Sequence, residues 1–235
     1  MRTLLIDIAI LGTVVFCAWR GYKNGLIRGV FGVVSLILSL FIANIAAQAY
    51  VDEAKAVLMP FASGIVETTI TENADNGIVY QPIAHDHEIN DEDFGIAYTA
   101  LREIGLPEAA AVSVAEKSLE AYEIDDKDTT FPDIIADNLT TALSFVAVFG
   151  IAFLLIAIIF AVIGNLVGFV FSLPGLKLVD IIAGSALGLI KGIIIVYTLA
   201  VIVRYVGMLA LNTVEGTTIL HYLVNNNPIA NMLRI

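Results

Sequence analysis

The sequence predicts an all-α integral membrane protein with about four transmembrane helices arranged as two repeated hairpins. Hydrophobic residues make up 58% of the chain and charged residues 15%, whereas soluble domains have roughly 45–50% apolar and about 25% charged residues. Several long stretches without charge approach the roughly 20 residues that a membrane-spanning helix needs. A glycine motif also occurs twice, each time between two such stretches, which indicates that the hairpin is repeated.

This glycine motif, GxxxGLI(R/K)G, covers residues 21–29 and residues 184–192. Because glycine has no Cβ, helices with this spacing can approach closely and gain dispersion contacts. We expect either tight packing within one monomer or a seam that joins copies into a homo-oligomer or lines a pore. The second copy is the better seam candidate, since Lys23 and Asn24 interrupt the first. The shared positions are Gly21, Gly25, Arg28 and Gly29, and then Gly184, Gly188, Lys191 and Gly192.

The first transmembrane hairpin is expected over residues 1–51, with spans from about Thr3 to Trp19 and from about Gly29 to Val51. The intervening loop, residues 20–28, carries three basic residues and no acidic one. The positive-inside rule therefore predicts that this loop lies in the cytoplasm, with the N-terminus and residue 52 onward outside.

Residues 52–139 are expected to form an acidic, mainly helical extracytoplasmic domain inserted between the second and third spans. They hold 20 of the chain's 23 acidic residues and only four of its 12 basic ones. No basic stripe is available to neutralise phosphates, which excludes nucleic acid as a partner. Helices are predicted over Asp91–Ile104 and Pro107–Tyr122, and Pro60 is a predicted kink or break.

The second hairpin is expected over residues 140–206, followed by an extracytoplasmic tail, residues 207–235, that contains an apolar segment and a last short helix. The third span should begin near residues 139–143 and end at about Val170. The last element leaves two starts open. A long tilted helix from Ile181 would let Lys191 snorkel toward the cytoplasm, and we prefer it; a start at Gly192 would leave residues 181–191 at the interface.

Four charges lie within or beside the predicted spans. A charge at the centre of a span costs at least about 2.5 to 3.5 kcal/mol, so such residues often mark a partner or a water-lined path. Less costly alternatives exist: Asp7 at the outer interface, Asp180 as an N-cap after a Pro-Gly turn, and Lys191 as a cytoplasmic anchor. The four charges are Asp7, Arg28, Asp180 and Lys191.

No constellation typical of catalysis, cofactor binding or a metal site is recognisable. His85, His87 and neighbouring carboxylates have the ligand types for a metal, but no second cluster completes a coordination sphere. The only cysteine, Cys17, excludes a disulfide framework. We therefore expect a protein that is not an enzyme and that binds neither metal nor cofactor.

The order of these features resembles the colicin V production protein (CvpA) family of bacterial inner-membrane proteins, usually drawn with four spans. The resemblance covers roughly residues 3–51 and 140–206. In that family an Arg commonly follows the Asp that corresponds to Asp180, whereas this chain has Ile181. The residues that carry the resemblance are Ile6-Asp7, Arg20-Gly21, Gly25, Arg28, Ser35-Leu36, Gly175–Asp180, Gly184, Gly188 and Lys191-Gly192.

The resemblance implies a multi-pass protein of the bacterial inner membrane that is linked to toxin production or secretion and to envelope robustness, without a known reaction. From the sequence we expect an accessory or scaffold protein in the lipid bilayer, whose acidic domain binds an envelope or secretion protein. The alternative is a small oligomeric channel or transporter with a glycine-lined path and charges along it.

Overall fold

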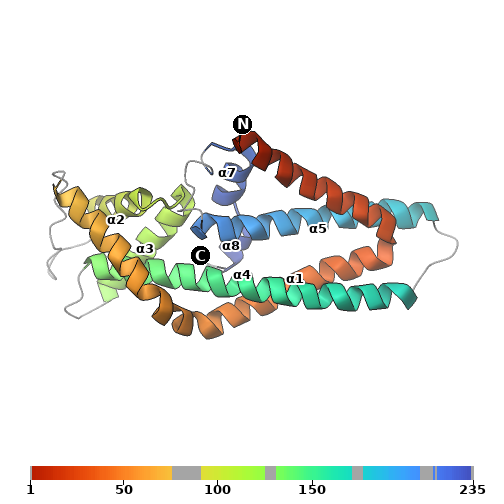
Figure 1. Ribbon diagram of the computed structural model, residues 1–235, viewed down its shortest axis with the longest axis horizontal. Coiled ribbons are helices and arrows are strands. Elements are labelled where there is room, and N and C mark those ends of the chain that lie inside the picture. Colours follow the sequence, from red (N-terminus) through yellow and green to blue (C-terminus); the bar gives the residue numbers. More distant parts are fainter. Residues whose placement is uncertain are drawn as a thin grey trace.

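The computed structural model describes residues 2–75, 91–124, 131–170, 177–206, 214 and 216–233. Every regular element within these ranges is a helix, so the prediction of an all-α protein is confirmed for this part of the chain (Figure 1). The helices are α1 (Arg2–Asp75), α2 (Asp91–Glu103), α3 (Glu108–Ile124), α4 (Phe131–Val170), α5 (Lys177–Val206), α7 (Thr218–Asn225) and α8 (Pro228–Leu233).

Helix α1 is 74 residues long, and Gly25 is the residue at which its backbone leaves helical geometry. A first segment, residues 2–24, and a second segment, residues 26–75, meet there at a sharp bend (Figure 1). The predicted loop over residues 20–28 is therefore wrong. A single glycine with φ of 75° makes the turn, because L-residues with side chains rarely adopt this backbone conformation.

Three helices are long and apolar enough to cross a membrane, over Leu4–Gly64, Pro132–Gly164 and Asp180–Tyr205. Their outward faces carry large apolar side chains, such as Phe41 at 61% exposure and Ile151 at 63%. Exposed apolar surface on this scale is unfavourable in water and favourable against lipid tails. The fold is thus consistent with an inner-membrane protein in contact with a lipid bilayer.

The spans pack in an interleaved order. Along α1, the first segment packs against α5, and the second segment runs antiparallel to α4, with Phe31 beside Gly164 and Lys55 paired with Asp137. The consecutive helices α4 and α5 share few contacts (Figure 1). Two separately packed hairpins would need the opposite arrangement, so residues 2–75 pack against both α4 and α5 instead of forming a pair of helices of their own.

Helices α2 and α3 lie against one end of α1 and α4 (Figure 1). Their bounds agree with the predicted helices to within two residues. Gly105, with φ of 99°, makes the turn between them. Helix α1 continues through Pro60 to Asp75 and changes direction on the way, so Pro60 does not end the helix (Figure 1).

Helix α4 begins at Phe131, earlier than the predicted start of the third span, because its first turns are buried in the core below α3. Helix α5 is continuous from Lys177 to Val206, which supports the long-helix alternative. The last short helix that the sequence predicts is present as α8. Asn227, 1% exposed, accepts hydrogen bonds from the N–H groups of Ile229 and Ala230 and thereby caps α8.

Candidate functional site

The two copies of the glycine motif pack against each other within one chain. A Cβ placed on Gly184 would lie 2.6 Å from the carbonyl oxygen of Gly21, and one on Gly188 would lie 2.9 Å from the Cα of Gly21. A Cβ on Gly21 would in turn collide with the carbonyl oxygen of Gly184. Because α1 and α5 run antiparallel here, the motifs form one seam of backbone-to-backbone contact.

The outer glycines of each copy extend this seam. A Cβ on Gly29 would lie 3.0 Å from the side chain of Leu187, and one on Gly192 would lie 3.0 Å from the Cβ of Cys17 and from the Cα of Val14. Gly184 and Gly188, the better candidates for an oligomer seam by sequence, are covered here by the first segment of α1.

Asp180 occupies the bend at Gly25. Its Oδ1 accepts a hydrogen bond of 2.7 Å from the N–H of Leu26, one of the donors left free where the second segment of α1 begins. A Cβ on Gly25 would collide with the carboxylate. The expected capping role is therefore found on a different helix: Asp180 lies inside the first turns of α5 and caps α1.

Asp7 makes a second contact of this kind at the opposite end of the seam. Its carboxylate accepts hydrogen bonds from the N–H groups of Thr218, Ile219 and Leu220, at 3.1, 3.1 and 3.4 Å. These donors are the first residues of α7, whose own N-cap, Thr217, makes no side-chain capping bond. Both aspartates thus stabilise the start of a helix that is distant in sequence.

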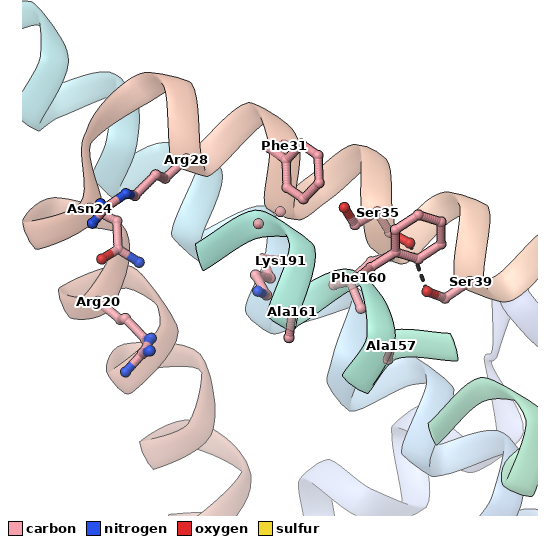
Figure 2. Close-up of a pocket in the computed structure, with 13 residues that line it drawn as sticks. Arg20, Asn24, Arg28, Phe31, Ser35, Ser39, Ala157, Phe160, Ala161 and Lys191 are labelled. Atoms are coloured by element: carbon pink, nitrogen blue, oxygen red, sulfur yellow. Dashed lines mark hydrogen bonds between the residues drawn. The ribbon is translucent and has the colours of Figure 1, made fainter. Parts of the chain in front are cut away.

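A cavity of about 130 Å³ lies between the two segments of α1, α4 and α5. We call it the cationic pocket. Figure 2 shows Arg20, Asn24 and Arg28 at one end of it, Ser35, Ser39 and Phe160 at the other, and Lys191 between them. It is lined by Arg20, Asn24, Arg28, Phe31, Gly32, Ser35, Leu36, Ser39, Ala157, Phe160, Ala161, Gly164 and Lys191.

Lys191 enters this pocket from α5 and is half-buried. A Cβ on Gly32 would lie 3.4 Å from its Nζ, so the glycine leaves room for the ammonium group. Arg20 and Arg28 are exposed at one end, whereas Ser35 and Ser39 are buried. The Oγ of Ser39 donates to the carbonyl oxygen of Ser35 at 2.7 Å. The pocket therefore joins positive charges to a wall of small and aromatic side chains.

Sequence reasoning missed the pocket, although Arg28 and Lys191 were singled out. Ser35 and Ser39, four residues apart in an uncharged span, share a helix face with Phe31. That spacing is the signal that could have identified this face of α1. The partner face on α4 consists of Ala157, Ala161 and other common residues, and it carries no comparable signal.

A second polar position is Arg204, near the end of α5. It is 5% exposed, and its guanidinium donates to the carbonyl oxygen of Ala109 in α3. The neighbouring Tyr205 is fully buried. Arg204 thus ties the transmembrane helix α5 to α3, a role that the apolar surroundings of this residue in the sequence do not indicate.

Among the residues whose side chains the structure describes, no group of three or more His, Cys, Asp or Glu residues is arranged to hold a metal ion. The sequence candidate at His85 and His87 lies outside the described residues.

Residues 124–228 match the family model described as colicin V production protein. The match extends from the end of α3 to the start of α8, and includes Asp180 and the second glycine motif. No curated protein and no solved structure matches the chain. The resemblance to the colicin V production protein family is thus confirmed over residues 124–228.

Proposed function

We propose that the chain is a non-enzymatic scaffold of the bacterial inner membrane that supports colicin V-type toxin production or secretion and envelope maintenance. In this proposal the chain crosses the membrane four times, because each segment of α1 contributes one span. Both termini and residues 52–139 lie outside. The acidic helices present a surface to an envelope or secretion protein.

The observation that carries this proposal is the continuity of one hydrophobic core from the spans into α2 and α3. Leu40 in α1, Leu101 in α2, Val114 in α3 and Phe149 in α4 belong to the same buried cluster. A scaffold must hold its partner surface in a fixed position relative to the membrane, and a shared core provides this rigidity.

The roles of the aspartates also favour a scaffold. A carboxylate in a transport path would need access to water or to the transported ion. Asp7 and Asp180 instead accept backbone hydrogen bonds that join distant helices. Their charges therefore stabilise the bundle, and no transport function is needed to explain them.

Cysteine labelling tests the proposed topology. In a Cys17→Ala background, Lys23→Cys, Glu120→Cys and Asn231→Cys place single thiols at exposed positions. A membrane-impermeant maleimide added to intact spheroplasts should label positions 120 and 231, and should label position 23 only after permeabilisation. Labelling of position 23 in intact spheroplasts would contradict the proposed orientation.

Charge reversal tests the scaffold itself. Glu116→Lys with Glu120→Lys changes an exposed face of α3, whereas Asp52→Lys with Glu53→Lys is a matched change on α1 near the membrane. In a toxin-producing host that lacks its own copy, the α3 variant should reduce toxin secretion and the α1 variant should not. Equal secretion by both variants and the unaltered chain, at equal membrane levels, would refute a partner surface on α3.

A channel or transporter is the second candidate, and the cationic pocket is the observation that favours it. Purified chain in liposomes should then pass anions, and Lys191→Leu should reduce the flux. Liposomes with no flux under voltage, a pH gradient or membrane tension would exclude this candidate.

A further inference from the structure

We propose that the cationic pocket binds a phosphate group, presented either by the headgroup of an acidic phospholipid or as a free anion. This inference uses the proposed orientation of the chain in the membrane, but it does not depend on the scaffold or on the channel. It rests on the charges around the pocket, on the position of Lys191 and on the shape of the walls.

The first argument is the charge of the lining. Arg20, Arg28 and Lys191 contribute three cations, and none of the described residues that line the pocket is acidic. Like charges gathered around one cavity repel each other, and the repulsion is stronger beside the low dielectric of lipid and protein. An anion between them replaces the repulsion by charge-assisted hydrogen bonds.

The second argument is that the positive-inside rule does not account for Lys191. Cations in a short connection, such as Arg20, are sufficient to hold that connection in the cytoplasm. Lys191 instead lies 14 residues after the start of α5, roughly 20 Å along the helix. It is half-buried over Gly32 and directed into the cavity, so its ammonium group is positioned toward the pocket (Figure 2).

The third argument concerns the kind of anion. The guanidinium group of Arg20 and the ammonium group of Lys191 offer several donors to one ligand, which suits a tetrahedral phosphate better than a small halide. The amide of Asn24 adds a neutral polar group at the same end.

The fourth argument concerns the rest of the ligand. From Arg28 to Ser39 the lining extends over 11 residues of α1, about 16 Å along the helix. Beyond the cations the walls combine the apolar side chains of Phe31, Leu36 and Phe160 with the buried hydroxyl groups of Ser35 and Ser39. Cations beside such a mixed wall suit the headgroup and glycerol region of a phospholipid. The opening lies at the end of the bundle that we propose to be cytoplasmic, where acidic lipids are available.

Native mass spectrometry on the purified full chain tests the inference. The chain is reconstituted in nanodiscs of phosphatidylcholine with increasing amounts of phosphatidylglycerol. The number of phosphatidylglycerol molecules that stay bound is measured after the protein is released from the nanodisc. We expect one preferentially retained molecule. Lys191→Gln should weaken its retention by about tenfold or more, the effect of losing one charge-assisted hydrogen bond, and Lys191→Arg should retain it because the charge remains.

Lys23→Gln is the matched control. Lys23 comes from the same part of α1, but its Nζ lies over the ring of Trp19, 3.9 Å from the centroid, and it does not line the pocket. This variant should retain the lipid as the unaltered chain does. An equal loss in Lys23→Gln and Lys191→Gln would show general surface attraction and would overturn the inference.

Inorganic phosphate distinguishes the two sources. In nanodiscs of phosphatidylcholine alone, millimolar phosphate is added and the thermal midpoint is measured, with chloride at equal ionic strength as the reference. If phosphate raises the thermal midpoint of the unaltered chain but not that of Lys191→Gln, free phosphate is a ligand. Retention of phosphatidylglycerol without such a rise would identify the lipid headgroup. If neither probe distinguishes Lys191→Gln from the unaltered chain, the pocket is not a phosphate site.

Discussion

The carboxylate of Asp180 accepts a hydrogen bond of 2.7 Å from the backbone N–H of Leu26, although 154 residues separate the two. The contact fixes the bend at Gly25 from the side of α5. It joins the first glycine motif to the residues just before the second one. The bend and the seam are therefore parts of one structural unit.

Asp180→Ala should destabilise the fold by about 0.5–2 kcal/mol, the usual cost of removing a helix N-cap. Asp180→Asn should cost much less, because an amide oxygen can accept the same hydrogen bond. The free energy of unfolding, measured by denaturant titration in mixed micelles, separates the two variants. Equal losses for both would mean that the charge of Asp180, and not its capping bond, stabilises the bend.

Gly25→Ala should destabilise the fold by more than about 1 kcal/mol. A residue with a side chain pays about 1–3 kcal/mol for this backbone conformation (φ 75°, ψ −180°), which is essentially restricted to glycine, and the new methyl group would also collide with Asp180. Gly64→Ala is the matched control, since a Cβ there meets nothing within 4 Å and the backbone is helical. A Gly25→Ala variant as stable as Gly64→Ala would contradict the bend at this residue.

Gly188→Ala should weaken the packing of α1 on α5. Its methyl group would meet the backbone of Cys17 and Gly21, which cannot move without separating the helices. Overpacking of this kind typically costs about 1–3 kcal/mol. Gly12→Ala, in the first segment of α1 with open space around it, should be neutral or slightly stabilising. The thermal midpoints of unfolding of the two variants are measured in detergent. A lower midpoint for Gly12→Ala than for Gly188→Ala would refute the seam.

Asp7→Ala should loosen α7 without unfolding the spans, because the carboxylate holds the first N–H groups of that helix. Hydrogen exchange across residues 218–225 should accelerate, whereas exchange within α4 should stay unchanged. Asp7→Asn should show a smaller effect, since Asn can also accept these bonds. Unchanged hydrogen exchange in α7 of the Asp7→Ala variant would contradict the capping role of Asp7.

The sequence was sufficient for the elements whose signal is local. Apolar stretches and turn residues predicted α2, α3 and the extent of α5 closely. Hydrophobic periodicity, Pro and Gly determine the secondary structure of the residues immediately around them, so these elements can be predicted from local sequence. The predicted loop at residues 20–28 failed for a physical reason. Its polar composition is typical of a loop, but Gly25 and the distant Asp180 allow the chain to turn within one residue.

The sequence alone could not predict which helices pack against each other. The repeat identified both glycine motifs correctly as features, but it could not tell whether each packs in its own hairpin or against the other copy. That choice depends on long-range contacts such as Gly21 with Gly184. The cationic pocket depends on the same pairing, since Lys191 lines one cavity with Ser35 and Phe160 only when both α4 and α5 pack against α1.

A disulfide between residues 17 and 192 tests the central claim that the two glycine motifs pack together within one chain. A Cβ at position 192 would lie 3.0 Å from the Cβ of Cys17, close to the roughly 3.8 Å of a disulfide. Gly192→Cys should therefore oxidise within the monomer, and its intact mass should fall by two hydrogens with no dimer on a non-reducing gel. Gly12→Cys, which has open space around it, should form no such bond. Covalent dimers of Gly192→Cys, or free thiols after oxidation, would contradict the seam.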